Sequence, residues 1–291
     1  MRLHVHEWGD ARAPAIVCLH GVTAHGRRFR RLAEERLARN FRVLAPDLRG
    51  HGRSGYEPPW NISTHLGDVL ETIDAAGIQQ PIPWLGHSFG GRLVLELCAA
   101  APERVTRAVF LDPAFQILPH VGFDFAEEVA RDHSYSTAEE AVEARLATAV
   151  RPSPREFVEE EASEHLVSSP DGRLRWRFSR AAAATVYGEL CTEPPAASAV
   201  RVPALLVHAS HFGLVREEQL AEYVARLGDR LEVAAVPGGH IVYWDAFQET
   251  ADAVEKFLLS DRAVTKSARR GRSRRARPPV SRSRSRGRGS D

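Results

Sequence analysis

The stretch Pro83-Trp84-Leu85-Gly86-His87-Ser88-Phe89-Gly90-Gly91 predicts a short buried strand, an abrupt turn and a helix that begins at once. The helix is indicated by an apolar stripe with the i, i+3, i+4, i+7 spacing of one helix face. Its members are Gly90, Leu93, Val94 and Leu97. Gly86 and Gly90 flank Ser88 at the two positions where a Cβ would crowd a tight strand-to-helix turn. Such a turn presents the serine oxygen at the start of the helix, which makes Ser88 a candidate nucleophile.

The pattern G-x-S-x-G also occurs by chance, as an ordinary glycine-rich turn with an exposed serine. Its position between a strand and an amphipathic helix favours the nucleophile. The free N–H groups and the dipole of a helix N-terminus favour negative charge that develops near Ser88.

Strands and helices alternate on both sides of this stretch. The run Ala15–Leu19 is apolar throughout, as expected of a strand buried on both faces of a parallel sheet. Strands are also predicted at 2–8 (an edge strand), 41–45, 105–111, 204–208 and 231–236, and helices at 28–39, 62–76, 216–227 and from 247 onward. This alternation predicts the α/β class, with a mostly parallel, doubly wound sheet.

The alternation stops between residues 116 and 197, which contain helical, acidic segments and no clear strand. We therefore expect a core of two parts, 1–115 and 198–259, with an inserted helical cap at 116–197. Residues 260–291 are rich in Arg and Ser without apolar periodicity, which predicts a disordered tail.

The net charge of +1 is unevenly distributed along the chain. The segment 260–291 contains eleven Arg and one Lys against two Asp, so the remaining residues carry a net charge of −9. Such a tail can bind polyanions weakly and without specificity. A specific nucleic-acid function is less favoured because no module that reads bases accompanies the tail.

Other features bear on the compartment. Three cysteines, Cys18, Cys98 and Cys191, are too few for a disulfide framework and indicate small buried side chains in a reducing environment. The N-terminal residues contain no apolar segment typical of a signal peptide, and no run approaches the roughly 18 apolar residues of a membrane span. We expect a cytoplasmic protein with no membrane partner.

Four motifs in this order resemble the α/β-hydrolase superfamily. They are His20-Gly21 after the first buried strand, Asp47-x-x-Gly50-His51-Gly52-x-Ser54, Gly86-His87-Ser88-Phe89-Gly90-Gly91, and Gly239-His240 before the last helix. The resemblance covers Leu3 to Leu259 and is weakest in the expected cap.

The resemblance implies a role for each motif. Ser88 would attack a carbonyl carbon, and His240 would act as general base. The backbone N–H groups of Val22 and Phe89 would form the oxyanion hole. The implied chemistry needs no cofactor and no metal.

The acid of the implied triad departs from the usual family pattern. Most members place it in the loop after the strand before the last one, where this chain has Phe212. A branch similar to the haloalkane dehalogenases, some esterases and some lactonases places it after strand six instead. Asp112 occupies that position, 24 residues after Ser88, and we expect it to be the catalytic acid. Alternatively, Asp112 only caps the turn before Pro113.

Several weaker candidates remain. His25 follows the oxyanion loop and is predicted to contact substrate, although a solvated loop histidine is as compatible with the sequence. Trp176 would line the pocket or anchor the cap. His4 and His6 share a strand face, but two ligands without a third make a poor metal site.

The expected function is hydrolysis of a small-molecule carboxylic ester or lactone through Ser88, His240 and Asp112 and an acyl-enzyme intermediate. A carbon–carbon bond hydrolase would use similar residues. The missing acid at Phe212 also leaves open a non-catalytic binding protein with this fold.

Overall fold

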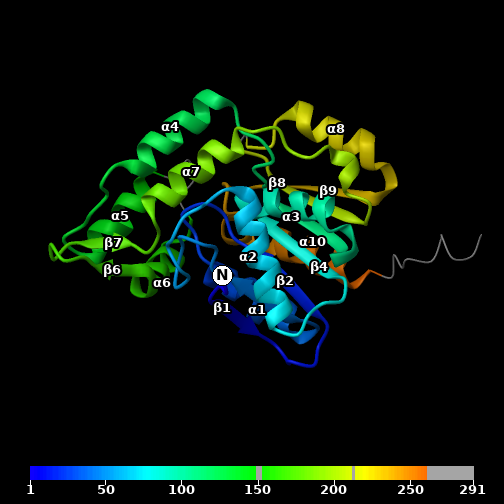
Figure 1. The fold of residues 1–291 in the computed structure, drawn as a ribbon, viewed down its shortest axis with the longest axis horizontal. Helices are drawn as coiled ribbons and strands as arrows, with labels where there is room; N and C mark the ends of the chain where they lie inside the picture. The colour runs from blue at the N-terminus through cyan, green and yellow to red at the C-terminus, as the bar shows by residue number, and fades with distance from the viewer. Residues whose placement is uncertain (149–152, 212–213, 261–291) are drawn as a thin grey trace, which may run out of the picture. The chain divides into compact units, whose positions relative to one another are not determined.

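The computed structural model describes residues 1–148, 153–211 and 214–260. Its main feature is a seven-stranded sheet in the order β1-β3-β2-β4-β5-β8-β9, in which only β1 runs antiparallel to its neighbour (Figure 1). The strands are β1 (Val5–Trp8), β2 (Ala15–Leu19), β3 (Arg42–Pro46), β4 (Ile82–His87), β5 (Val105–Leu111), β8 (Ala204–Ala209) and β9 (Leu231–Val236). The mostly parallel, doubly wound sheet predicted from the sequence is therefore confirmed.

Helices cover both faces of the sheet. They are α1 (Arg30–Glu35), α2 (Ile62–Ala75), α3 (Phe89–Ala100), α8 (Glu217–Leu227), α9 (Val242–Asp245) and α10 (Phe247–Leu259). Short 3-10 segments occur at Gly26–Phe29, Leu37–Arg39, Pro102–Arg104, Ala197–Ala199 and Gly228–Arg230. The single helix predicted at 28–39 is wrong, because Arg36 leaves the helical region at φ −128° and separates α1 from the segment that follows.

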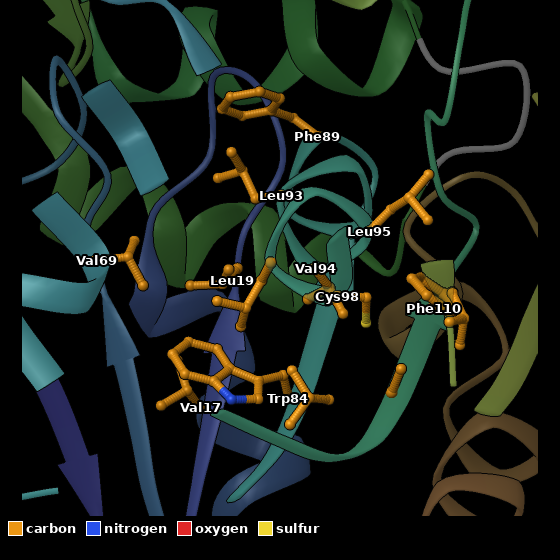
Figure 2. Close-up of a cluster of buried hydrophobic side chains, with 14 of the residues drawn as sticks. Val17, Leu19, Val69, Trp84, Phe89, Leu93, Val94, Leu95, Cys98 and Phe110 are labelled. Atoms are coloured by element: carbon orange, nitrogen blue, oxygen red, sulfur yellow. The ribbon is translucent and has the colours of Figure 1, made fainter. Parts of the chain in front are cut away.

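The side chains of β2 explain its continuous apolar run. Val17 and Leu19 belong to the core layer under α2, α3 and α8, whereas Ile16 and Cys18 belong to the layer under α1 and α10. Figure 2 shows the first layer, where Leu93 of α3 lies above β2 and β4. A central strand buried on both faces needs apolar residues at every position.

Residues 116–197 are here called the cap segment. Their described part, 116–148 and 153–197, contains the helices α4 (Pro119–Ala130), α5 (Ala138–Thr148), α6 (Arg155–His165) and α7 (Arg180–Leu190). In Figure 1 they lie together to the left of the sheet, with α4 beside α7. The expectation of no strand here is wrong, because β6 (Leu166–Ser168) and β7 (Leu174–Trp176) form an antiparallel hairpin. Its turn contains Pro170-Asp171-Gly172, and Gly172 has φ +77°, as turns with this composition often require.

Backbone hydrogen bonds join the cap segment to the loop after β3. The N–H of Ser179 donates to the carbonyl of Gly50 over 2.7 Å, and the N–H of Gly52 donates to the carbonyl of Arg177 over 2.9 Å. The Ser179 hydroxyl also accepts from the N–H of Ala182 and so caps α7.

None of the helices in the described part of the chain combines the length and the apolar composition that a membrane span requires. The predicted basic tail lies almost entirely outside the described residues.

Candidate active site

Ser88 occupies the turn between β4 and α3 with φ +53° and ψ −117°, a conformation that costs free energy for a residue with a side chain. The neighbouring glycines make the turn possible. A Cβ on Gly86 would stand 2.2 Å from the carbonyl oxygen of Gly90, and a Cβ on Gly90 would stand 2.0 Å from that of Leu19. The structure therefore has the sharp strand–turn–helix geometry that the sequence predicts.

Hydrogen bonds hold the strained turn in place. The N–H of Ser88 donates to the carbonyl of Leu111 over 3.1 Å. The carbonyl of Ser88 accepts from the N–H groups of Gly91 and Ala114, over 2.9 and 3.0 Å. Strain of this kind persists only where the surroundings over-determine the conformation, and it is typical of functional positions.

The loop after β2 lies directly against Ser88. A Cβ on Gly21 would stand 2.9 Å from the Cβ and 3.3 Å from the Oγ of Ser88, so a glycine is needed here. His20 supports the loop, since its Nδ1 is 2.7 Å from the carbonyl of Gly21 and its Nε2 accepts from the N–H of Leu48 over 2.8 Å. Burial lowers the pKa of His20 well below its usual value, so the ring is neutral and donates through Nδ1.

The two N–H groups expected to form the oxyanion hole belong to these two elements. Val22 follows Gly21 in the loop, and Phe89 is the first residue of α3. The N–H groups in the first turn of a helix have no acceptor within the helix. The Phe89 N–H is therefore suited to bind an anion beside Ser88.

Asp112 and His240 are in direct contact. Asp112 Oδ2 lies 2.6 Å from His240 Nδ1, and Asp112 Oδ1 accepts from the N–H of Ala209 over 3.1 Å. The aspartate is completely buried after the end of β5, where its backbone has φ +38°. The contact expected from the strand-six position is present, so Asp112 does more than cap the turn before Pro113.

The usual position of the acid contains no carboxylate, and the first carboxylates after it lie in a helix. Phe212, which occupies the usual acid position, lies outside the described residues. Glu217 and Glu218 are exposed in the first turn of α8.

His25 lies between the core and the cap segment. It is 5% exposed, its Nε2 is 3.0 Å from Glu161 Oε1, and its ring stacks on that of His165 at a centroid distance of 3.3 Å. A solvated loop histidine is therefore wrong. Substrate contact stays a prediction for His25, and its contacts in the structure instead join the loop after β2 to α6.

Glu161 is the centre of a buried ionic cluster that the sequence analysis missed. The Nε of Arg28 donates to its Oε1 over 2.7 Å, and the Nε of Arg145 lies 3.4 Å from its Oε2. Burial alone would raise the pKa of Glu161, but the charge of Arg28 and the hydrogen bond from His25 outweigh burial and lower that pKa. The signal was available in the sequence, because Val158, Glu161, Ala162 and His165 form the buried stripe of α6.

We expect Glu161→Gln to lower the free energy of unfolding at pH 7 by about 3 kcal/mol, because it leaves the Arg28 charge buried without a counter-ion. The matched control is Glu160→Gln, which removes a partly exposed partner of Arg30 and should cost about 1 kcal/mol or less. Urea denaturation measures both.

The pH dependence of this difference follows from the lowered pKa of Glu161. Because the pKa is lower in the folded state, the stabilisation is complete above the unfolded value of about 4.3 and is lost as pH falls below it. The stability gap between wild type and Glu161→Gln should therefore narrow in acid. If the stability difference between wild type and Glu161→Gln instead widens in acid, the pKa of Glu161 is not lowered in the folded state.

Trp176 packs in the cap segment against a small apolar cluster of Val142, Val158 and Ala162, with the Arg145 guanidinium 4.9 Å from its ring centroid. It also lines a cavity of about 90 Å³ together with Phe178 and Arg180. Both roles considered for Trp176, an anchor and a pocket wall, are compatible with this position.

His4 and His6 have a third possible metal ligand nearby, contrary to the sequence-based expectation. One ligand atom each of His4, His6 and Asp47 lies within 4.8 Å of the others. Both oxygens of Asp47 already accept hydrogen bonds: Oδ1 from the N–H of Gly26 and from His6 Nε2, and Oδ2 from the N–H of Arg53. These hydrogen bonds explain why the three residues lie together: Asp47 supports the loop after β3.

Comparison with known proteins is consistent with this geometry. A family model described as "alpha/beta hydrolase fold" matches residues 14–247, and the chain therefore belongs to the α/β-hydrolase family. Lipase LipV of Mycobacterium tuberculosis is 32% identical over 243 residues, which cover 82% of this chain and 91% of that lipase.

Two further relatives cover most of the chain. The sn-1-specific diacylglycerol lipase ABHD11 of Mus musculus is 28% identical over 260 residues, 86% of this chain and 82% of its own. The crystal structure of E-2-(acetamidomethylene)succinate hydrolase superposes with a TM-score of 0.78 at 27% identity, covering 89% of this chain and 95% of that one. Named relatives of this kind support hydrolase activity.

Proposed function

We propose that this protein is a serine hydrolase that cleaves carboxylic esters or lactones through Ser88, His240 and Asp112. The observation that carries the proposal is the 2.6 Å contact between Asp112 and His240, on the same sheet edge as the strained turn of Ser88. The similarity to two lipases supports the ester class.

In the first half of the reaction, Ser88 Oγ attacks the carbonyl carbon while its proton passes to Nε2 of His240. The carbonyl oxygen becomes an oxyanion, which the N–H groups of Val22 and Phe89 stabilise. Collapse of this intermediate breaks the bond to the alcohol oxygen, which takes the proton from His240. The acyl group remains on Ser88.

In the second half, His240 removes a proton from water, and the hydroxide oxygen attacks the acyl carbon. The bond to Ser88 Oγ breaks, Ser88 recovers its proton from His240, and the acid leaves. Asp112 keeps the Nδ1 proton of His240 in place and stabilises the imidazolium in both halves.

A fluorophosphonate probe tests the mechanism directly, because it phosphonylates a serine only where a base activates it. We expect rapid labelling of Ser88 and hydrolysis of p-nitrophenyl esters, with the preferred acyl length found from a graded series and a few lactones tested alongside. A protein that neither labels nor turns over any of these would instead be a non-catalytic member of the fold. Turnover confined to substrates that are cleaved at a carbon–carbon bond would favour the carbon–carbon bond hydrolase.

A further inference from the structure

The peptide bond between His240 and Ile241 is hydrogen-bonded on both sides. Its carbonyl oxygen lies 2.9 Å from Nε2 of His87, and its N–H donates to Oδ2 of Asp245 over 3.1 Å. This peptide carries the side chain of the proposed general base, so its orientation determines where the imidazole lies.

His87 holds the carbonyl side of this peptide. A carbonyl oxygen only accepts, so Nε2 of His87 must carry the proton. Burial lowers the pKa of His87 well below its usual value, which leaves the ring neutral with Nδ1 unprotonated. Because His87 directly precedes Ser88, one residue connects the nucleophile's turn to the peptide of the base.

Asp245 accepts the hydrogen bond from the N–H side of this peptide and also bonds a residue of the cap segment. Its second oxygen, Oδ1, accepts from the hydroxyl of Ser153 over 2.7 Å. Ser153 belongs to the cap segment and precedes α6 by two positions. A continuous line of hydrogen bonds therefore runs from the cap segment through Asp245 to the peptide of His240.

We infer that Asp245 is a positioning residue for His240, and that Ser153 makes this position depend on the cap segment. The inference rests on the proposed function. Asp245 acts through its hydrogen bonds to Ile241 N–H and Ser153, and it does not replace Asp112, which contacts the imidazole itself. A displacement of Ser153 would then change the hydrogen bonds that hold the peptide of His240.

The substitutions Asp245→Ala and Asp245→Asn separate hydrogen bonding from charge. Alanine releases the N–H of Ile241, and a small misplacement of the base is expected to lower kcat about 10- to 100-fold with KM changed less than about two-fold. Asparagine keeps both contacts, since its oxygen accepts from Ile241 N–H while its amide donates to Ser153. It should restore kcat to within about three-fold of wild type.

Ser153→Ala removes only the link to the cap segment and should lower kcat about three- to ten-fold. Ser163→Ala is the matched control, because Ser163 is exposed and its hydroxyl donates to the carbonyl of Glu160 within its own helix. It should leave kcat unchanged. If Asp245→Ala fails to fold, Ser153→Ala and Asp245→Asn still test the inference. Thermal melting checks that each of these variants is folded.

A readout that needs no turnover distinguishes failure of the inference from failure of the proposed function. The proton shared by Asp112 and His240 should give a low-field NMR resonance, assigned by its loss in His240→Ala. We expect Asp245→Ala to shift or broaden it and Asp245→Asn to leave it in place. An unchanged resonance and kcat in both Asp245→Ala and Ser153→Ala would overturn the inference. An equal loss of kcat in Asp245→Asn and Asp245→Ala would also overturn the inference, because the loss would then come from removal of the carboxylate charge and not of the hydrogen bonds.

Discussion

Replacing Ser88 by Ala is expected to lower kcat for ester hydrolysis by about 10⁶-fold, the order of magnitude found when a triad nucleophile is removed. The residual rate would come from the oxyanion hole and from substrate binding. Folding should be unaffected, because the turn is held by backbone hydrogen bonds of Ser88 to Leu111, Gly91 and Ala114, which alanine retains. Initial rates with the best p-nitrophenyl ester measure the loss.

Two further measurements make this result specific. Ser88→Ala should abolish fluorophosphonate labelling while its melting temperature stays within a few degrees of wild type. Ser63→Ala is the control, because Ser63 is exposed at the start of α2 and its hydroxyl donates to Oδ1 of Asn61. Turnover by Ser88→Ala at more than about a hundredth of the wild-type rate would rule out Ser88 as the nucleophile.

The sheet could be predicted because the apolar runs that mark its strands are local in sequence. In β2, each of Ile16, Val17, Cys18 and Leu19 is buried against one of two helix layers, so the run contains no polar position. The turn at Ser88 was also predictable, since the close contacts at Gly86 and Gly90 exclude any side chain. The patterns that predict these features are short and contiguous in the sequence, although the contacts behind them include remote residues such as Leu19.

The position of Asp112 required the family resemblance. Its contact with His240 joins residues that are 128 positions apart, and no local pattern brings them together. The resemblance placed Asp112 at the end of one strand and His240 after another. Parallel strands with their carboxyl ends at one edge of a sheet then bring such residues close.

The cap segment was predicted less well because its structure depends on tertiary contacts. The strands of the β6–β7 hairpin have three residues each, too few for an alternating pattern, although the Pro-Asp-Gly turn marked its position. The sequence predicts only that Glu161 belongs to a helical, acidic segment. Its partners His25 and Arg28 lie more than 130 residues earlier in the chain, so the spacing within α6 could indicate a buried face but not the charges that Glu161 meets there.

Asp112→Asn is expected to lower kcat by up to about 10⁴-fold while the side chain keeps its shape and place. The structure indicates how the amide would orient. Asp112 Oδ1 accepts from the N–H of Ala209, so the asparagine oxygen should take that bond and turn its NH₂ group toward His240. A donor facing Nδ1 favours the imidazole with its proton on Nε2. That tautomer cannot accept the proton of Ser88.

Steady-state kinetics and fluorophosphonate labelling should both show this loss, with KM much less affected than kcat. Glu217→Gln is the matched control, an exposed carboxylate in the first turn of α8 whose change should alter kcat less than two-fold, about the scatter of such assays. Because the tautomer is wrong while the geometry is retained, raising the pH should not restore the rate, and thermal stability should fall only modestly. Full activity in Asp112→Asn would show that His240 works without this acid, and a catalytic dyad would then replace the proposed triad.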